Sequence, residues 1–208
     1  MKIGVVAANG RVGQKVVKDA VKSGDDVTAI VRHENQTVAQ DVLQKDLFDL
    51  TTEDLNKFDV VVDAFGVWEP DQLKKHQTSL EHLTKILADT DVRLIIVGGA
   101  GSLYINKEKG IHLMDTPDFP DTFKPLASAM GKALQELKNV KNVRWTYISP
   151  AADFQTDGPQ KGQYQVKNDE FTTDKNGVSA ISYADYAQAL VDEIHNNKYE
   201  NQQISVRW

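Results

Sequence analysis

The stretch MKIGVVAANGRVGQKVVKDAVKSGDDVTAIVR, residues 1–32, decides the fold. It opens with a short apolar run typical of a buried strand, Lys2–Val6, and continues through the small-residue turn Ala7–Gly13. Valines and alanines then recur at helical spacing until Gly24, and Val27–Val31 is a second apolar run of strand type. Strand, tight turn, helix and strand together predict a βαβ unit with parallel strands and a right-handed crossover.

The turn has the spacing of a dinucleotide-binding fingerprint, in which small residues let the backbone approach a pyrophosphate. Gly10 and Gly13 stand three residues apart, and Ala7 takes the place of the first glycine of that pattern. The helix behind such a turn directs unpaired N–H groups and its positive dipole end at the anion. We therefore expect a dinucleotide to be bound by Ala7, Asn9, Gly10, Arg11, Val12 and Gly13. The alternative is a tight turn without a ligand, which would use the same glycines.

The end of the second strand distinguishes between the two nicotinamide dinucleotides. Folds that prefer NAD usually place Asp or Glu there to accept hydrogen bonds from the ribose, whereas this chain has Arg32 followed by His33. A guanidinium can bind a 2′-phosphate through two parallel hydrogen bonds, and Arg11 in the turn adds a second positive charge. The pattern favours NADP(H) over NAD(H), unless both arginines are ordinary surface residues.

The composition is that of a soluble globular protein, expected to form one domain over residues 1–208. The net charge of −6 disfavours binding to nucleic acid or to an anionic membrane surface, because both need a basic face. The chain has no cysteine, and its five histidines lack metal-ligand spacing, so no metal site is predicted. Without a leader sequence or a long apolar run, the protein is expected in the cytoplasm.

Three further apolar runs predict strands: FDVVVDAF (58–65), Arg93–Val97 and Asn142–Ser149. Each is followed by small residues, which leave room for a ligand at the carboxyl ends of parallel strands. A brief third strand is expected to end near Lys45, and Ile204–Trp208 to form an edge strand. Within residues 152–178, GQYQV (162–166) and EFTT (170–173) are two short strand candidates. Helical patterns between the strands complete a single doubly wound α/β domain with a mainly parallel sheet of six or seven strands.

Several segments spread over the whole chain carry a family resemblance: AANGRVG with Arg32, VVDAFG (61–66), VGGAGSL (97–103), MDTPDFP (114–120), YISPAADF (147–154) and ISYADYA (181–187). They resemble the atypical short-chain dehydrogenase/reductase family. Within it, the chain is similar to the NAD(P)H-binding branch of NADH-flavin reductases, which is related to biliverdin-IX-beta reductases and to NmrA-like redox sensors. The resemblance implies a Rossmann domain with a small insertion on the substrate side, between residues 152 and 178.

The resemblance also implies which residues contact the cofactor. Asp46, after the third strand, matches a position near the adenine, although an acidic loop residue is an equal alternative. The remaining positions, expected to line the ribose, pyrophosphate and nicotinamide, are Ala64, Phe65, Gly66, Gly99, Ser149, Pro150 and Ala151.

The family's usual catalytic pair, Tyr-x-x-x-Lys, is incomplete in this chain. The nearest match is Ser128 with Lys132, and a serine hydroxyl has too high a pKa to replace the tyrosine as an acid. The usual serine after the fifth strand is displaced to Ser102. The candidate catalytic residues are therefore Ser102, Lys132 and His112. His112 belongs to a loop over residues 103–123 that is expected on the substrate side.

These departures disfavour carbonyl or alcohol chemistry more than hydride transfer to a flavin, because solvent can protonate an exposed nitrogen. The favoured function is an NADPH-dependent reductase of a small flat acceptor such as a flavin or quinone, active as a monomer or homodimer. The alternative is a non-catalytic NADP(H)-binding redox sensor that acts through a protein partner. A sugar-nucleotide epimerase or dehydratase would require the missing tyrosine and a larger substrate domain.

Overall fold

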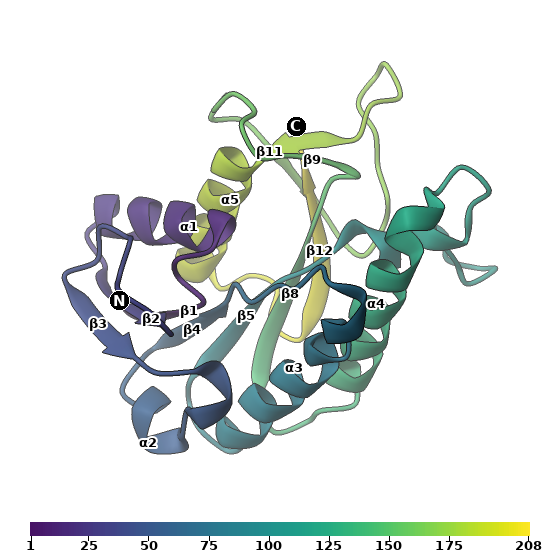
Figure 1. The fold of residues 1–208 in the computed structure, drawn as a ribbon. Helices are drawn as coiled ribbons and strands as arrows, with labels where there is room; N and C mark the ends of the chain where they lie inside the picture. The colour runs from purple at the N-terminus through teal and green to yellow at the C-terminus, as the bar shows by residue number, and fades with distance from the viewer.

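The computed structural model describes all 208 residues and contains one large sheet of eight strands (Figure 1). The strand order is β10-β12-β8-β5-β4-β1-β2-β3, and every pairing is parallel except that of β10 with β12. The strands are β1 (Lys2–Val6), β2 (Asp26–Val31), β3 (Asp41–Gln44), β4 (Val60–Asp63), β5 (Arg93–Val97), β8 (Arg144–Pro150), β10 (Gln165–Lys167) and β12 (Gln202–Arg207). The order reverses beside β1, so the predicted doubly wound α/β class is confirmed.

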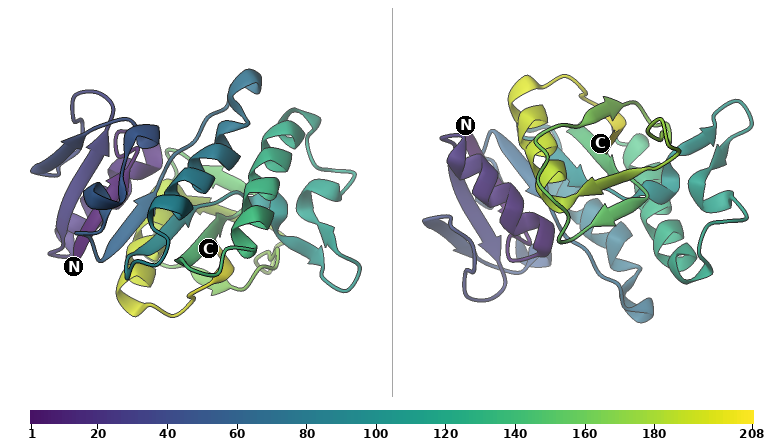
Figure 2. Two further views of the ribbon diagram at one scale, coloured as in Figure 1. Left: turned by 90° about the horizontal axis from the view of Figure 1, so that it is seen from below. Right: turned by 90° about the horizontal axis from the view of Figure 1, so that it is seen from above.

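Helices cover both faces of this sheet (Figures 1 and 2). They are α1 (Arg11–Lys22), α2 (Thr52–Leu55), α3 (Lys75–Ile86), α4 (Lys124–Lys138) and α5 (Tyr183–Asn196). On one face α1 and α5 pack together, and on the other α3 packs against α4. No helix is both long enough and apolar enough to span a membrane.

The apolar strands divide their side chains between two buried clusters, one on each face. Val5 of β1 belongs to the cluster that includes Val17 of α1 and Leu190 of α5. The next residue, Val6, belongs to the cluster formed with Leu83 of α3 and Leu134 of α4. This alternation explains why the central strands read as nearly continuous apolar runs: both of their faces are covered.

Two small two-stranded sheets complete the fold, and several expected boundaries change. β6 (Tyr104–Asn106) pairs with β7 (Ile111–His112), and this hairpin projects beside α4, so the 103–123 segment is partly regular structure (Figure 2). β9 (Asp153–Gln155), at the start of the insertion, pairs with β11 (Ala180–Ser182), which follows it.

The strand expected at Ile204–Trp208 is present as β12, but its expected place at the edge is wrong, because β10 pairs antiparallel with β12 and covers its outer edge. The second short run of the insertion, EFTT (170–173), forms no strand either. Its only ladder partner is Tyr104, which donates to the carbonyl of Asp169 at 2.8 Å and accepts from the N–H of Phe171 at 2.9 Å. Because Tyr104 alone pairs with EFTT, this run forms a single β-bridge and not a strand.

A buried ion pair fastens α5 to the sheet. Arg93 of β5 and Glu193 of α5 are 2% and 5% exposed, and their side chains form a short ion pair. Arg93 also donates to the Glu193 carbonyl at 3.1 Å and to Thr146 Oγ1 at 2.8 Å, while Glu193 accepts from the Tyr199 N–H at 2.9 Å. The pair therefore joins β5, β8, α5 and the turn that leads to β12.

We predict that Glu193→Ala lowers the free energy of unfolding by about 3–5 kcal/mol, because it leaves the Arg93 guanidinium buried without its counter-charge. The double variant Arg93→Leu with Glu193→Leu should lose less than Glu193→Ala alone, since it removes both charges. Urea unfolding of the three proteins tests this. A double variant as unstable as the single one would contradict the explanation.

Candidate dinucleotide site

The turn between β1 and α1 depends on two unusual backbone positions. Ala7 has a φ of 56°, in the left-handed region, at the place where the fingerprint normally has its first glycine. Its carbonyl accepts a hydrogen bond from the Gly10 N–H at 2.9 Å. A Cβ on Gly13 would lie 2.8 Å from the carbonyl oxygens of Ala7 and Ala8, so only glycine lets the helix approach the strand this closely.

The first turn of α1 offers donors without acceptors. Gly10 stands at the N-cap with an extended backbone and gives no side-chain cap, and the first turn contains no acidic residue. The backbone N–H groups of Arg11, Val12 and Gly13 have no hydrogen-bond acceptor in the chain. Unpaired N–H groups at the positive end of a 12-residue helix suit a phosphate group, so the residues present fit a dinucleotide pyrophosphate.

The loop after β2 brings together the residues expected at the ribose end. The Arg32 side chain is 65% exposed, and its Nε lies 3.9 Å from the Asp46 carboxylate. Asp46 accepts from the Phe48 N–H at 2.9 Å and so caps the 3-10 turn that follows it. Arg11 is exposed at the start of α1. Arg11 thus begins α1 and Arg32 follows β2 directly, and no carboxylate ends β2.

The Asn9 side chain connects the turn to the loop after β2. Its Nδ2 donates to the Glu34 carbonyl at 2.8 Å, and its Oδ1 accepts from the Gln36 N–H at 2.8 Å. The side chain thereby fastens the loop after β2 to the turn. Both hydrogen bonds are to the chain's own backbone, so Asn9 supports the turn, and its contact with a ligand stays a prediction.

The remaining cofactor candidates follow the carboxyl ends of β4, β5 and β8, which are neighbours in the sheet. Their exposure differs. Ala64, Phe65 and Gly99 are half-buried and Gly66 is exposed, whereas Ser149, Pro150 and Ala151 are buried. The Ser149 hydroxyl accepts from Gln203 Nε2 at 3.0 Å, so it contacts the chain itself and contributes only backbone to the sheet's edge.

The three candidate catalytic side chains have separate surroundings, and no hydrogen bond or ion pair joins them. Ser102 is buried and accepts from Gln203 Nε2 at 2.9 Å. The His112 ring packs on Tyr104 with 4.4 Å between ring centroids, and its Nδ1 lies 3.3 Å from Asp115. Lys132 is exposed on α4, while its neighbour Ala133 faces the sheet. Their role in catalysis stays a prediction.

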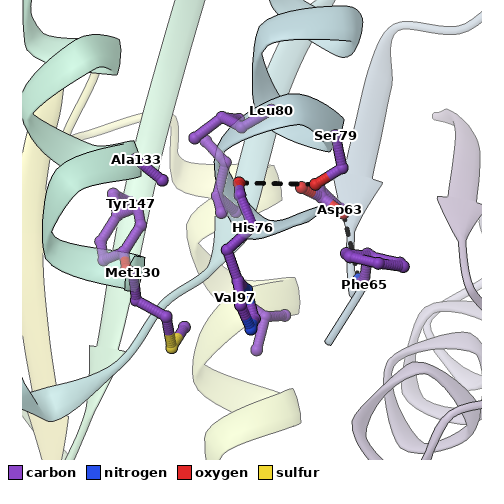
Figure 3. Close-up of a pocket in the computed structure, with 10 residues that line it drawn as sticks. Asp63, Phe65, His76, Ser79, Leu80, Val97, Met130, Ala133 and Tyr147 are labelled. Carbon is purple, nitrogen blue, oxygen red and sulfur yellow. Dashed lines mark hydrogen bonds between the residues drawn. The ribbon is translucent and has the colours of Figure 1, made fainter. Parts of the chain in front are cut away.

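A small cavity beneath the strand ends contains polar groups that the sequence analysis did not single out. Figure 3 shows its lining, which is mostly apolar but includes Asp63, His76, Ser79 and Tyr147. The cavity has a volume of about 20 Å³, room for one water molecule, which needs about 10–15 Å³. The available signal was Asp63 itself, a carboxylate inside the apolar run FDVVVDAF.

Asp63 is the most perturbed acid of this group. It is 4% exposed and accepts one hydrogen bond, from the Phe65 N–H at 3.0 Å. Burial raises the pKa of its carboxyl to about 6, and the hydrogen bond from Phe65 only partly opposes this. Burial likewise raises the pKa of the Tyr147 hydroxyl to about 12. Asp63 therefore exchanges its proton near neutral pH, while Tyr147 stays protonated.

A doubly wound sheet whose first turn opens a helix with unpaired N–H groups defines a nucleotide-binding protein of the Rossmann class. The comparisons with known proteins are more specific. The family model described as NAD(P)H-binding matches residues 7–197. The chain belongs to this NAD(P)H-binding family.

Several relatives share nearly the full length of the chain. The uncharacterised protein YwnB of Bacillus subtilis (strain 168) is 44% identical over 99% of this chain and 98% of its own. A Streptococcus pneumoniae TIGR4 structure, described as "a putative NADH-flavin reductase", is 49% identical with a TM-score of 0.97, covering 100% and 99% of the two chains. A Bacteroides thetaiotaomicron structure described as a "putative epimerase" is 30% identical with a TM-score of 0.84, covering 100% and 96%.

We predict that Gly13→Ala weakens NADPH binding at least tenfold and lowers the free energy of unfolding by about 1–3 kcal/mol. The added Cβ would press on two backbone carbonyls and push α1 away from β1. Fluorescence titration and urea unfolding measure the two effects. Gly66→Ala is the matched control for stability, because its Cβ would meet no atom within 4 Å. If Gly13→Ala bound NADPH as tightly as the wild type, the close approach of α1 to β1 would not be required for binding.

We predict that Asp63→Asn stabilises the protein at neutral and alkaline pH. The raised pKa means that the folded chain keeps a proton that the unfolded chain loses, so wild-type stability falls as pH rises from 3.8 to about 6. At ~1.4 kcal/mol for each pH unit, asparagine should restore about 3 kcal/mol above this window and nothing below it. Urea unfolding across the pH range measures the difference. Asp71→Asn, at an exposed position, should show no such pH-dependent gain.

Proposed function

We propose that this protein is an NADPH-dependent reductase that transfers hydride to a small flat acceptor, with flavins and quinones as the first candidates. The observation that carries the proposal is the start of α1, where three unpaired N–H groups face the edge of the sheet. Membership of the NAD(P)H-binding family supports a nicotinamide cofactor there. The Streptococcus pneumoniae structure described as "a putative NADH-flavin reductase" supports the choice of reaction.

The preference for NADPH rests on charge at the ribose end. Arg11 and Arg32 both carry positive charge beside the turn, and β2 ends without the carboxylate that an unphosphorylated ribose favours. A guanidinium pairs well with a phosphate dianion because its planar N–H groups match two oxygens. Asp46, 3.9 Å from Arg32, holds that side chain near the loop but leaves it 65% exposed.

The protein's part in the reaction is binding and orientation. The N–H groups of Arg11, Val12 and Gly13 would hold the pyrophosphate, and the backbone around Gly99 and Pro150 would border the nicotinamide. When bound, the reduced dinucleotide supplies the hydride. The strand ends would keep donor and acceptor face to face and exclude water between them, which is the main contribution available without a Tyr-x-x-x-Lys pair.

A second candidate function is a non-catalytic NADP(H) sensor that acts through a protein partner. The observation that favours it is the separation of Ser102, His112 and Lys132, which form no catalytic group with one another. Ser128 also stands where the resembled enzymes have tyrosine, which disfavours an epimerase as well.

A titration with NADPH and NADH, followed by a panel of flavins and quinones, distinguishes these functions. The reductase should bind NADPH and oxidise it in the presence of at least one acceptor, which the loss of nicotinamide absorbance records. Tight binding with no turnover of any acceptor would favour the sensor. Absence of binding to either dinucleotide would contradict both.

We predict that Arg32→Ala weakens NADPH binding by about 10- to 100-fold, as expected for the loss of a charged hydrogen bond worth about 1.5–3 kcal/mol. Affinity for NADH should change less than about twofold, because NADH lacks the 2′-phosphate. Fluorescence titration with both cofactors measures the two changes. Lys22→Ala is the matched control, since Lys22 is exposed at the opposite end of α1. Equal losses for both cofactors would show that Arg32 does not read the 2′-phosphate.

A further inference from the structure

We propose that Asp63 supplies the proton that the acceptor takes up, passing it through a water molecule in the cavity beneath the strand ends. This rests on the proposed reductase function and assigns a role to a buried acid outside the dinucleotide site.

The register places Asp63 in a row of apolar side chains. Val6 of β1 lies beside Asp63 of β4, which lies beside Ile96 of β5, which lies beside Tyr147 of β8. Val6, Ile96 and Tyr147 all belong to the buried cluster under α3 and α4. Asp63 is the last residue of β4, so its carboxyl stands on this face directly below the edge where the cofactor is expected.

The carboxyl has an unused oxygen and space beside it. Oδ1 accepts the Phe65 N–H, whereas Oδ2 has no donor in the chain and is not sealed from a water-sized space. The cavity at this point holds about one water molecule and also touches Phe65 and Val97, which lie at the ends of β4 and β5. Figure 3 shows Asp63, Phe65 and Val97 around this space. A water there would connect the acid to the edge of the sheet.

The other groups around the cavity leave Asp63 as its proton donor. From α3, His76 donates Nε2–H to the Val67 carbonyl at 3.0 Å, and burial lowers its pKa, which disfavours the charged ring. From β8, Tyr147 accepts the Gly99 N–H at 3.2 Å, and burial raises its pKa to about 12. From α4 the lining residues are Met130 and Ala133, which carry no charge.

Tyr147 also connects the cavity to the predicted cofactor edge. Its hydroxyl oxygen bonds to the backbone of Gly99, one of the positions expected beside the nicotinamide. A Cβ on the preceding residue, Gly98, would lie 2.2 Å from the Tyr147 ring, so the small residue permits this contact. The cavity is therefore joined to the end of β5 through one side chain.

A proton from Asp63 completes the stoichiometry of the proposed reduction. Two-electron reduction of a flavin or quinone takes up one hydride, from the reduced dinucleotide, and one proton. The O–H bond of the Asp63 carboxyl breaks as the cavity water passes a proton to the acceptor, where a new N–H or O–H bond forms. Bulk water then protonates the carboxylate again. A carboxyl that titrates near pH 6 is suited to both directions of this exchange.

The pH dependence of turnover tests the proposal. Wild-type kcat should fall as pH rises through about 6, because the protonated carboxyl is the active form. Asp63→Asn should lower kcat at least tenfold below that pH and remove the inflection, while the NADPH Kd stays within about twofold. Asp71→Asn, an exposed acid before α3, is the control and should keep the wild-type profile. An Asp63→Asn protein with wild-type kcat and the same inflection would overturn the proposal.

A direct titration of the carboxyl does not depend on activity. Carbon-13 NMR of aspartate-labelled wild type should show one carboxyl titrating near pH 6, absent from Asp63→Asn, with and without NADPH. Should the variant fail to fold, the wild-type titration still decides, because a kcat inflection that no carboxyl matches would refute the role. If the wild type turns over no acceptor, the proposed function fails and this role fails with it. If wild type and variant turn over alike, only the role of Asp63 fails.

Discussion

The close approach of α1 to β1 is the contact on which the rest of the structure depends. Gly13 lies so near the carbonyls of Ala7 and Ala8 that a single methyl group would collide with both. This contact fixes where the helix begins and aims its free N–H groups at the sheet's edge. It also brings Val16 and Val17 onto the sheet, where they meet α5 across the same buried cluster. Because Gly13 has no side chain, the backbones of α1 and β1 lie close together, and this contact determines both the packing of α1 and the position of the candidate anion site.

The first βαβ unit and the doubly wound, mainly parallel sheet could be predicted because local patterns indicate them. The number of strands could not: six or seven were expected, and the sheet has eight. Apolar runs, a spaced pair of glycines and helical valines have a single structural explanation in the first 32 residues. The insertion was harder. β10 is three residues long, and its pairing with β12 joins positions 42 residues apart at Gln165 and Arg207. No local pattern specifies such a partner, so Ile204–Trp208 looked like an edge.

The candidate site, too, has a part that local sequence could predict and a part that it could not. The turn and Arg32 are adjacent in sequence to the elements that place them, so their neighbourhood was predictable. The Asn9 side chain, by contrast, bonds to Glu34 and Gln36 across 25 and 27 positions. Asp63 was read as part of an apolar strand, because its face and its neighbour Tyr147 follow only from the register of four strands. Ser102 and Lys132 came from the family resemblance and His112 from a loop without periodicity, and neither kind of signal shows what surrounds a residue.

The two hydrogen bonds of Asn9 have a consequence for how cofactor preference can change. They tie the phosphate turn to the loop that follows Arg32, so the parts that would hold the pyrophosphate and the ribose form one mechanical unit. The partners are the Glu34 carbonyl and the Gln36 N–H, so a replacement for residues 33–40 keeps these hydrogen bonds only where its backbone follows the same path. A point substitution at Arg32 leaves this backbone path in place, whereas a grafted loop with a different path would break both hydrogen bonds to the turn.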